Sequence, residues 1–259
     1  MTVNHTYFSA EKLKFRHTVT GKLCWCVPLL LAAGASWLAG DYAQADSFNW
    51  WYAGVLPGYL TLLCCQVIRK DQRLKDQIVL TLPTEPVLVW DAKVVYCVRM
   101  LVISNLILGV LALLVRIPAE QLFGAGQSIE ISPIRILAAC ILLNICYLWQ
   151  IPFCLWLAVR MGFLSVFFLN LLCNVIGTVF LSLTGWWVFC PYAVPARLMC
   201  AVIRILPNGL AAEKGSLTYS PELMEMQAVI PGTIVCAGAF LAAWVFTRKW
   251  YGKTAVSRD

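Results

Sequence analysis

Residues 94–115 read VVYCVRMLVISNLILGVLALLV, a run of 22 residues in which Arg99 is the only charge. Because a helix rises about 1.5 Å per residue, such a run is long enough to cross the roughly 30 Å hydrocarbon core of a bilayer. In lipid, a helix is the only single segment that satisfies all of its own backbone hydrogen bonds. This stretch therefore predicts a membrane-spanning helix, and it sets the fold class.

The same pattern recurs along the whole chain. The composition is 61% hydrophobic and 13% charged, with a mean hydropathy of +0.76, whereas soluble domains hold about 45–50% apolar and 25% charged residues. We therefore expect an all-α integral membrane protein whose 259 residues form a single transmembrane domain. The six predicted membrane-spanning helices cover residues 23–39, 50–68, 94–115, 134–159, 163–183 and 233–250.

The basic residues are distributed unevenly between the two sides of this predicted bundle. With the N-terminus inside, the cytoplasmic segments hold 14 Lys and Arg and the outer segments hold 5. Because basic residues are enriched in cytoplasmic loops, both termini are predicted to be cytoplasmic. Residues 9–17 are basic and partly apolar, which predicts a helix lying along the inner surface. The outer segment 184–232 contains several prolines, and short re-entrant or interfacial helices are expected there before the last span.

No motif in the sequence predicts an enzyme. His5 and His17 both lie in the N-terminal tail, and the twelve cysteines contain no CxxC pair, so no metal site is expected. No catalytic residue and no cofactor bound by this chain are predicted. Nucleic acid is not an expected partner, because no polar domain gathers Lys and Arg on one face. Whether Cys190 and Cys200 pair stays open.

Ion-coupled transport is also not indicated, because no carboxylate lies in the middle of a predicted span. Several amide side chains do lie within the spans. They are expected to form interhelical hydrogen bonds rather than to contact a substrate. These residues are Asn105, Asn144, Gln150, Asn170 and Asn174.

One cytoplasmic loop, residues 70–93, reads KDQRLKDQIVLTLPTEPVLVWDAK. Its apolar side chains recur at every fourth position from residue 74 to residue 82, so a helix there would present one apolar ridge. A ridge of this kind in water needs a surface to cover it, which predicts a docking element over residues 71–83; a helix lying on the bilayer is the alternative. The residues of the predicted docking element are Arg73, Leu74, Lys75, Asp76, Ile78, Leu82 and Pro83.

This loop resembles the hallmark of ABC-2 type permeases, which is a charged segment after the second helix, a Leu-rich turn ending in Thr-Leu-Pro, and a Lys before the third helix. The subfamily is suggested by residues 48–52 (FNWWY) and 56–58 (LPG), which follow EKLKFRHT at residues 11–18. They are similar to the E-type permease subunits of lantibiotic-immunity ABC transporters.

The resemblance implies a machine in the bacterial cytoplasmic membrane. The loop would be the coupling helix that docks on a cytosolic ABC ATPase dimer, and ATP and Mg²⁺ would bind to that partner. A second, non-identical permease subunit and membrane lipid would complete the assembly, and its cargo would be a cationic lantibiotic peptide. Two alternatives remain: an ABC-2 exporter of a drug, lipid or glycan, and a membrane sensor or scaffold without transport activity.

The outer segments hold seven acidic residues against five basic ones, which would concentrate a cationic peptide near the membrane. Tryptophan rings beside these acids could hold the apolar parts of that peptide. The alternative is that the acids keep the loops soluble while the tryptophans anchor helices at the interface. The residues predicted to face the substrate are Trp50, Trp51, Trp186, Trp187, Glu213, Glu222 and Glu225.

Overall fold

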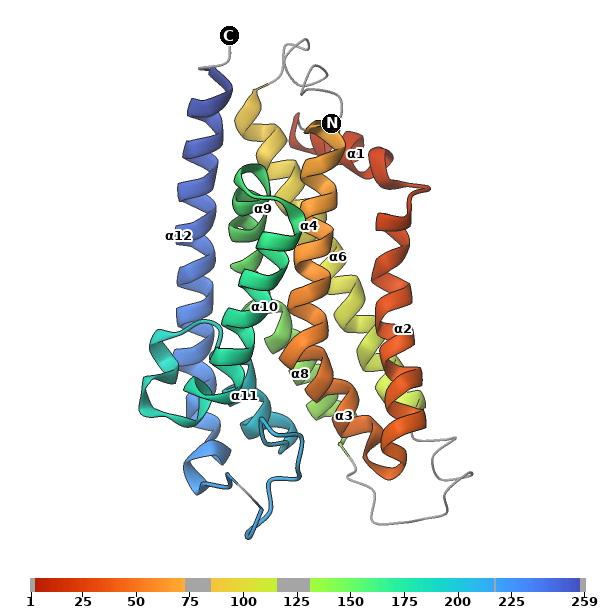
Figure 1. Cartoon of the computed structure of the whole chain (residues 1–259), viewed down its shortest axis with the longest axis vertical. Helices are drawn as coiled ribbons and strands as arrows, with labels where there is room; N and C mark the ends of the chain where they lie inside the picture. The colour runs from red at the N-terminus through yellow and green to blue at the C-terminus, as the bar shows by residue number, and fades with distance from the viewer. Residues whose placement is uncertain (1–2, 73–84, 116–130, 217, 257–259) are drawn as a thin grey trace.

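The computed structural model describes residues 3–72, 85–115, 131–216 and 218–256, and this part of the chain folds as a helical bundle (Figure 1). Five helical runs are long and apolar enough to cross a membrane, and a bent pair of helices supplies a sixth. An all-α chain with five or six candidate spans is therefore confirmed. The side of the membrane on which the termini lie remains a prediction.

The spans extend beyond the predicted apolar runs because their polar ends continue the helices. The second run, Ala43–Gln72, passes without a break through three elements: α3, a π-helical turn at Trp51–Val55, and α4. The bounds of the elements in these runs are α2 (Val19–Ala39), α3 (Ala43–Trp50), α4 (Leu56–Gln72), α6 (Pro86–Leu114), α10 (Phe163–Val179) and α12 (Val229–Val256).

The predicted fourth span is divided into α8 (Pro133–Tyr147) and α9 (Gln150–Arg160), which are bent by about 40° relative to each other. Pro152 explains the break. It has no N–H to donate to the carbonyl of Leu148, and its ring clashes with that carbonyl in a regular helix. The backbone N–H of Ile151 instead reaches the Leu148 oxygen at 3.1 Å, as in a tighter turn.

The N-terminal helix α1 (Val3–Phe15) lies across one end of the bundle, the end at which the C-terminal part of α12 is also found (Figure 1). Residues 9–15 of the predicted helix are thus part of α1, and Arg16 and His17 lie in the turn that follows it. Thr18 ends the turn between α1 and α2, because its hydroxyl donates to the Phe15 carbonyl at 3.1 Å and accepts from the N–H of Gly21 at 3.4 Å. This cap directs the chain from α1 into the first span.

A short helix, α11 (Val194–Ile203), is inserted at the opposite end of the bundle, and all of its ten residues are buried. It packs against α8, α10 and α12. Arg197 is 8% exposed, and its guanidinium donates to the carbonyl of Glu222 at 2.9 Å. The short helices expected before the last span are therefore present, and α11 belongs to the core of the bundle. Cys190 and Cys200 are free thiols in this structure.

The amide side chains within the spans connect helices, as predicted. Asn174 donates to the carbonyl oxygens of Tyr52 and Ala53 in the π-helical turn, at 3.1 and 2.8 Å. Asn170 donates to the side-chain oxygen of Gln150 at 3.1 Å. Asn105 accepts from the indole N–H of Trp51 and donates to Asn144. These bonds fix the register of the bundle around the π-helical turn.

Candidate functional site: a buried ion ring beside residues 73–84

Four charged side chains meet at the end of the bundle where α1 lies across α4 and α6. Glu11 and Lys14 come from successive turns of α1, Asp71 from the last turn of α4, and Lys93 from the third turn of α6. We call these four residues the ion ring. Helix α4 ends at Gln72 and α6 begins at Pro86. The ring therefore lies beside both helix ends that adjoin the predicted docking element.

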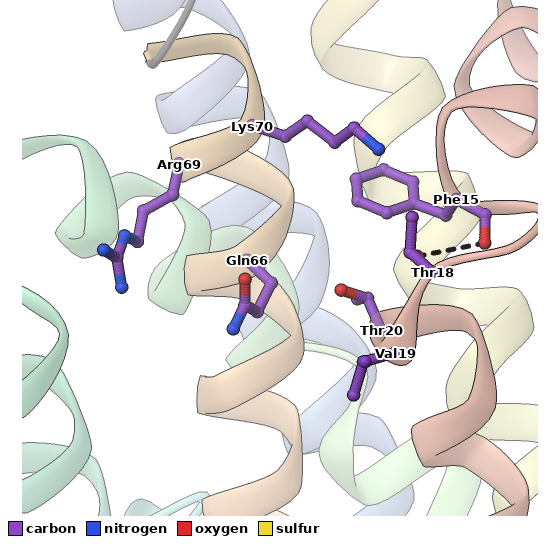
Figure 2. A pocket seen from close by; sticks show the side chains of 7 residues that line it. All are labelled: Phe15, Thr18, Val19, Thr20, Gln66, Arg69 and Lys70. Atoms are coloured by element: carbon purple, nitrogen blue, oxygen red, sulfur yellow. Dashed lines mark hydrogen bonds between the residues drawn. The ribbon is translucent and has the colours of Figure 1, made fainter.

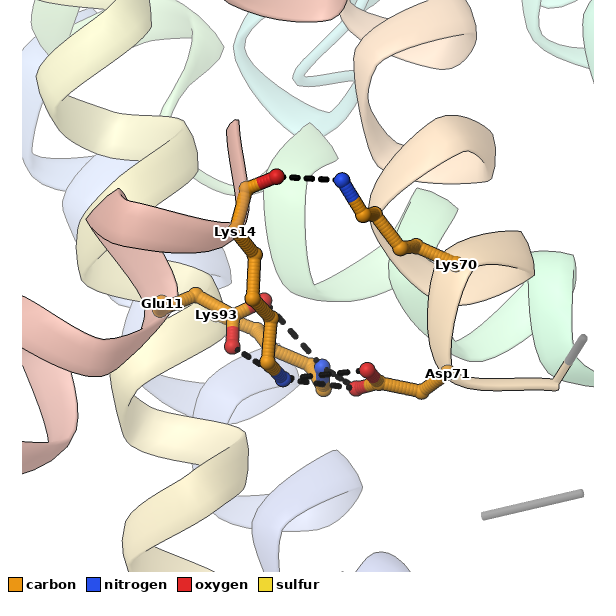
Figure 3. A network of polar contacts seen from close by, with 5 residues as sticks. All are labelled: Glu11, Lys14, Lys70, Asp71 and Lys93. Carbon is orange, nitrogen blue, oxygen red and sulfur yellow. Dashed lines mark hydrogen bonds and ion pairs between the residues drawn. The ribbon is translucent and has the colours of Figure 1, made fainter. Parts of the chain in front are cut away.

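Each carboxylate of the ion ring contacts both ammonium groups, so the charges alternate around a closed circuit (Figure 3). The Lys14 Nζ lies 2.8 Å from Glu11 Oε2 and 3.0 Å from Asp71 Oδ1. The Lys93 Nζ lies 3.2 Å from Glu11 Oε1, and it also pairs with Asp71 Oδ2. Two positive and two negative charges leave the circuit neutral.

Burial of these charges determines how much the loss of one of them would cost. Lys93 is 1% exposed, Glu11 2% and Asp71 6%, so water has little access to these three side chains, whereas the Lys14 side chain is 23% exposed. A buried ion pair adds little net stability compared with apolar residues, because desolvation of the charges offsets their attraction. Removing one member, in contrast, leaves an uncompensated buried charge and costs about 3–5 kcal/mol. The ion ring thus specifies one position of α1 relative to α4 and α6.

A further contact joins α1 to the end of α4. The Lys70 Nζ donates to the Lys14 carbonyl oxygen (Figure 3) and lies 5.0 Å from the centre of the Phe15 ring. The last turn of α4 is therefore held to the backbone of α1 as well as to the charged side chains of α1.

An open cavity of about 610 Å³ adjoins these contacts, between the turn that joins α1 to α2 and the last turns of α4 (Figure 2). Arg69 and Lys70 point away from each other on α4, and the side chain of Gln66 lies between them in this view. The cavity gives this end of the bundle a concave surface, lined by two cations from the last turns of α4. Its lining residues are Phe15, Thr18, Val19, Thr20, Gln66, Arg69 and Lys70.

The residues predicted to form the docking element lie in the segment 73–84, outside the described residues. Their role as a coupling helix stays a prediction. What the structure adds is the anchoring of both neighbouring helix ends.

The residues predicted to face the substrate are divided between surface and core. Trp186 is 72% exposed, and Trp50 is partly exposed. Trp51 is fully buried and donates its indole N–H to the Asn105 side chain at 2.7 Å, while Trp187 is 8% exposed and its ring lies 5.5 Å from the Arg197 guanidinium. In this conformation, neither buried ring is accessible from outside. The three predicted acids, Glu213, Glu222 and Glu225, are all exposed.

Comparison of the chain with protein-family models, with curated proteins and with solved structures finds no match. Any assignment of function therefore depends on the sequence and on the geometry of this chain.

Proposed function

We propose that the chain is the permease subunit of an ABC transporter that expels cationic lantibiotic peptides from the membrane. The observation that supports the proposal most directly is the ion ring. The segment predicted to dock on an ATPase, residues 71–83, lies between two helices, α4 and α6, that are both tied to α1 through Asp71 and Lys93. A force applied to that segment would act on three helices together.

Burial of the ion ring is what makes such a transfer efficient. A contact between exposed charges is worth about 0–1 kcal/mol and would break easily, whereas separating the buried Lys93 from Glu11 and Asp71 leaves unpaired charges in a site with little access to water. Movement of the docking segment is therefore passed on to the spans and is not lost as local rearrangement. In this proposal, the chain itself binds no nucleotide. ATP and Mg²⁺ bind to a cytosolic ATPase dimer, and a second permease subunit completes the pore.

Co-purification tests the proposal. A tagged chain, expressed in its native host and purified in mild detergent, should carry an ABC ATPase with it. The double variant Leu74→Asp/Ile78→Asp should lose that partner, because each apolar anchor in a docking groove contributes about 2 kcal/mol or more, roughly 30-fold in affinity. The matched control Lys249→Asp, at an exposed residue of α12 at the same end, should retain it.

The cargo is tested separately. Cells that lack the chain should become sensitive to a cationic lantibiotic, and the complementing gene should restore protection. An ATPase partner without such protection would favour the ABC-2 exporter of another cargo. If no ATPase co-purifies with the intact chain, the transporter proposal is refuted, and the sensor or scaffold alternative takes its place.

A further inference from the structure

A recess of about 370 Å³ opens at the end of the bundle opposite the ion ring, between α3 and the turn at residues 208–210. Two of its lining side chains, Asp46 and Trp50, share one face of α3 because they lie four residues apart, and Tyr42 lines the recess from the 3₁₀ turn Gly40–Tyr42 just before α3. Asn49, in the same helix, also lines the recess. This wall of the recess therefore carries one carboxylate and two aromatic side chains.

The backbone on the opposite wall keeps this recess open. Gly209 has a φ of +86°, a conformation that residues with a side chain rarely adopt. A Cβ at this position would lie 2.9 Å from Asn49 Nδ2 and 3.5 Å from Asp46 Oδ1. Any larger residue at position 209 would thus intrude on the two polar groups of α3.

Those polar groups are incompletely satisfied. Among the described residues, no hydrogen bond or ion pair to the Asp46 carboxylate is found. Asn49 is 8% exposed, and its Oδ1 is buried without a hydrogen-bond partner. An unpaired buried acceptor costs about 1–3 kcal/mol. The Asn49 atom that faces Gly209 is Nδ2, so the acceptor open to a donor in the recess is the Asp46 carboxylate.

We propose that the recess binds a primary ammonium group, specifically the lysine side chain of a cationic peptide. An ammonium group carries three N–H donors, and the unpaired Asp46 carboxylate is an acceptor of opposite charge in the recess. Tyr42 and Trp50 supply aromatic faces, and these attract organic cations. A hard metal ion would need six or more oxygen ligands, and aromatic rings supply none.

This inference deepens the proposed function, because it names the group of the cargo that the chain recognises. Its test is nevertheless independent of transport, since binding is measured on the chain alone without an ATPase. The full chain is reconstituted in nanodiscs of phosphatidylcholine. The probe is Nα-acetyl-lysine methylamide, and its neutral counterpart is Nα-acetyl-norleucine methylamide. Binding is followed by saturation-transfer difference NMR.

The lysine probe should bind, and the norleucine probe should bind at least ten-fold more weakly. Asp46→Asn keeps the shape of the side chain and should lower affinity for the lysine probe about ten-fold, because a charge-assisted hydrogen bond is lost. Trp50→Leu should lower it about two- to five-fold through loss of the cation–π contact. Gly209→Ala should close the recess and abolish binding.

Two control variants remove a carboxylate and a tryptophan ring outside the recess. Glu85→Gln removes an exposed charge from the opposite end, and Trp37→Leu removes an exposed ring of α2; both should bind the lysine probe as the unmodified chain does. Circular dichroism and gel filtration verify that each variant is folded, and Asp46→Asn alone decides the question if Gly209→Ala misfolds.

Equal binding of the two probes would overturn the inference, as would an Asp46→Asn variant that retains full affinity. Calcium that displaces the lysine probe from the unmodified chain but does not bind to Asp46→Asn would identify a metal site instead. If the lysine probe binds but no ATPase co-purifies with the intact chain, this inference stands while the transporter proposal is refuted.

Discussion

Replacing Lys93 by methionine should detach α1 from the bundle without unfolding the spans. The Lys93 ammonium is 1% exposed and contacts both carboxylates of the ion ring. Methionine fills a similar volume but, among the residues that the structure describes, leaves Glu11 and Asp71 paired only with Lys14. One negative charge then remains uncompensated in a buried site, which costs about 3–5 kcal/mol. The least costly relief is to move α1 and Glu11 away.

Hydrogen–deuterium exchange of the purified chain measures this release. If the cost falls on the docking of α1, protection of the α1 amides should drop by roughly two to three orders of magnitude, while α4 and α6 exchange as before. The matched control is Arg248→Met, which removes a cation from another ion pair at the same end. Arg248 pairs with Asp91 at 2.9 Å, but its side chain is 40% exposed, so its loss should cost about 0–1 kcal/mol.

A double variant separates charge balance from packing. Glu11→Gln/Lys93→Met removes one charge of each sign and leaves the Lys14–Asp71 pair intact. Its loss of protection should be smaller than the sum of the two single losses, with a coupling of about 1–3 kcal/mol. Additive losses, or an α1 that exchanges in Lys93→Met as it does in the unmodified chain, would refute the reasoning.

Three further predictions concern other parts of the chain. Neutralising Glu213, Glu222 and Glu225 together should lower protection against a cationic lantibiotic, mainly at low salt, because the Debye length is about 10 Å at 0.1 M; unchanged protection in growth assays at all salt concentrations would favour a solubilising role. Asn174→Leu leaves two carbonyls of the π-helical turn without their donor and should destabilise the chain by roughly 1–3 kcal/mol, seen as a lower Tm in detergent. Gly21→Ala places a Cβ 2.6 Å from the carbonyl oxygen of the last residue of α1, so it should open the α1–α2 turn and raise proteolysis there, whereas an unaltered digestion pattern would show that the turn adapts.

The apolar spans could be predicted from the sequence because a bilayer imposes a length and a composition on each one. The run at residues 94–115, for example, lies almost entirely within α6. The N-terminal helix and the hydrogen bonds among the intramembrane amides followed from local pattern and from the high cost of an unsatisfied polar group in lipid. Pro152 was a local signal for the break between α8 and α9, but the surrounding apolar residues concealed it.

The ion ring could not be predicted in this way. Its partners lie 22, 57 and 82 residues apart in the sequence, and no periodicity relates positions so distant. Lys93 reads as an ordinary basic residue flanking a span, and Asp71 as part of a charged loop. Only the packing of α1 across α4 and α6 brings them together. The recess near Asp46 likewise requires a turn from residues 208–210, which lie far along the chain.

The π-helical turn at Trp51–Val55 lies directly against the end of α8, because the Tyr147 hydroxyl donates to the Tyr52 carbonyl at 2.5 Å. Two neighbouring spans therefore depart from regular α-helix at one common level, one by widening and the other by breaking. Helices bend most readily where their hydrogen-bond ladder is already interrupted. We therefore expect any tilt of one half of the bundle against the other to be taken up at this level, while the ladders on either side stay intact.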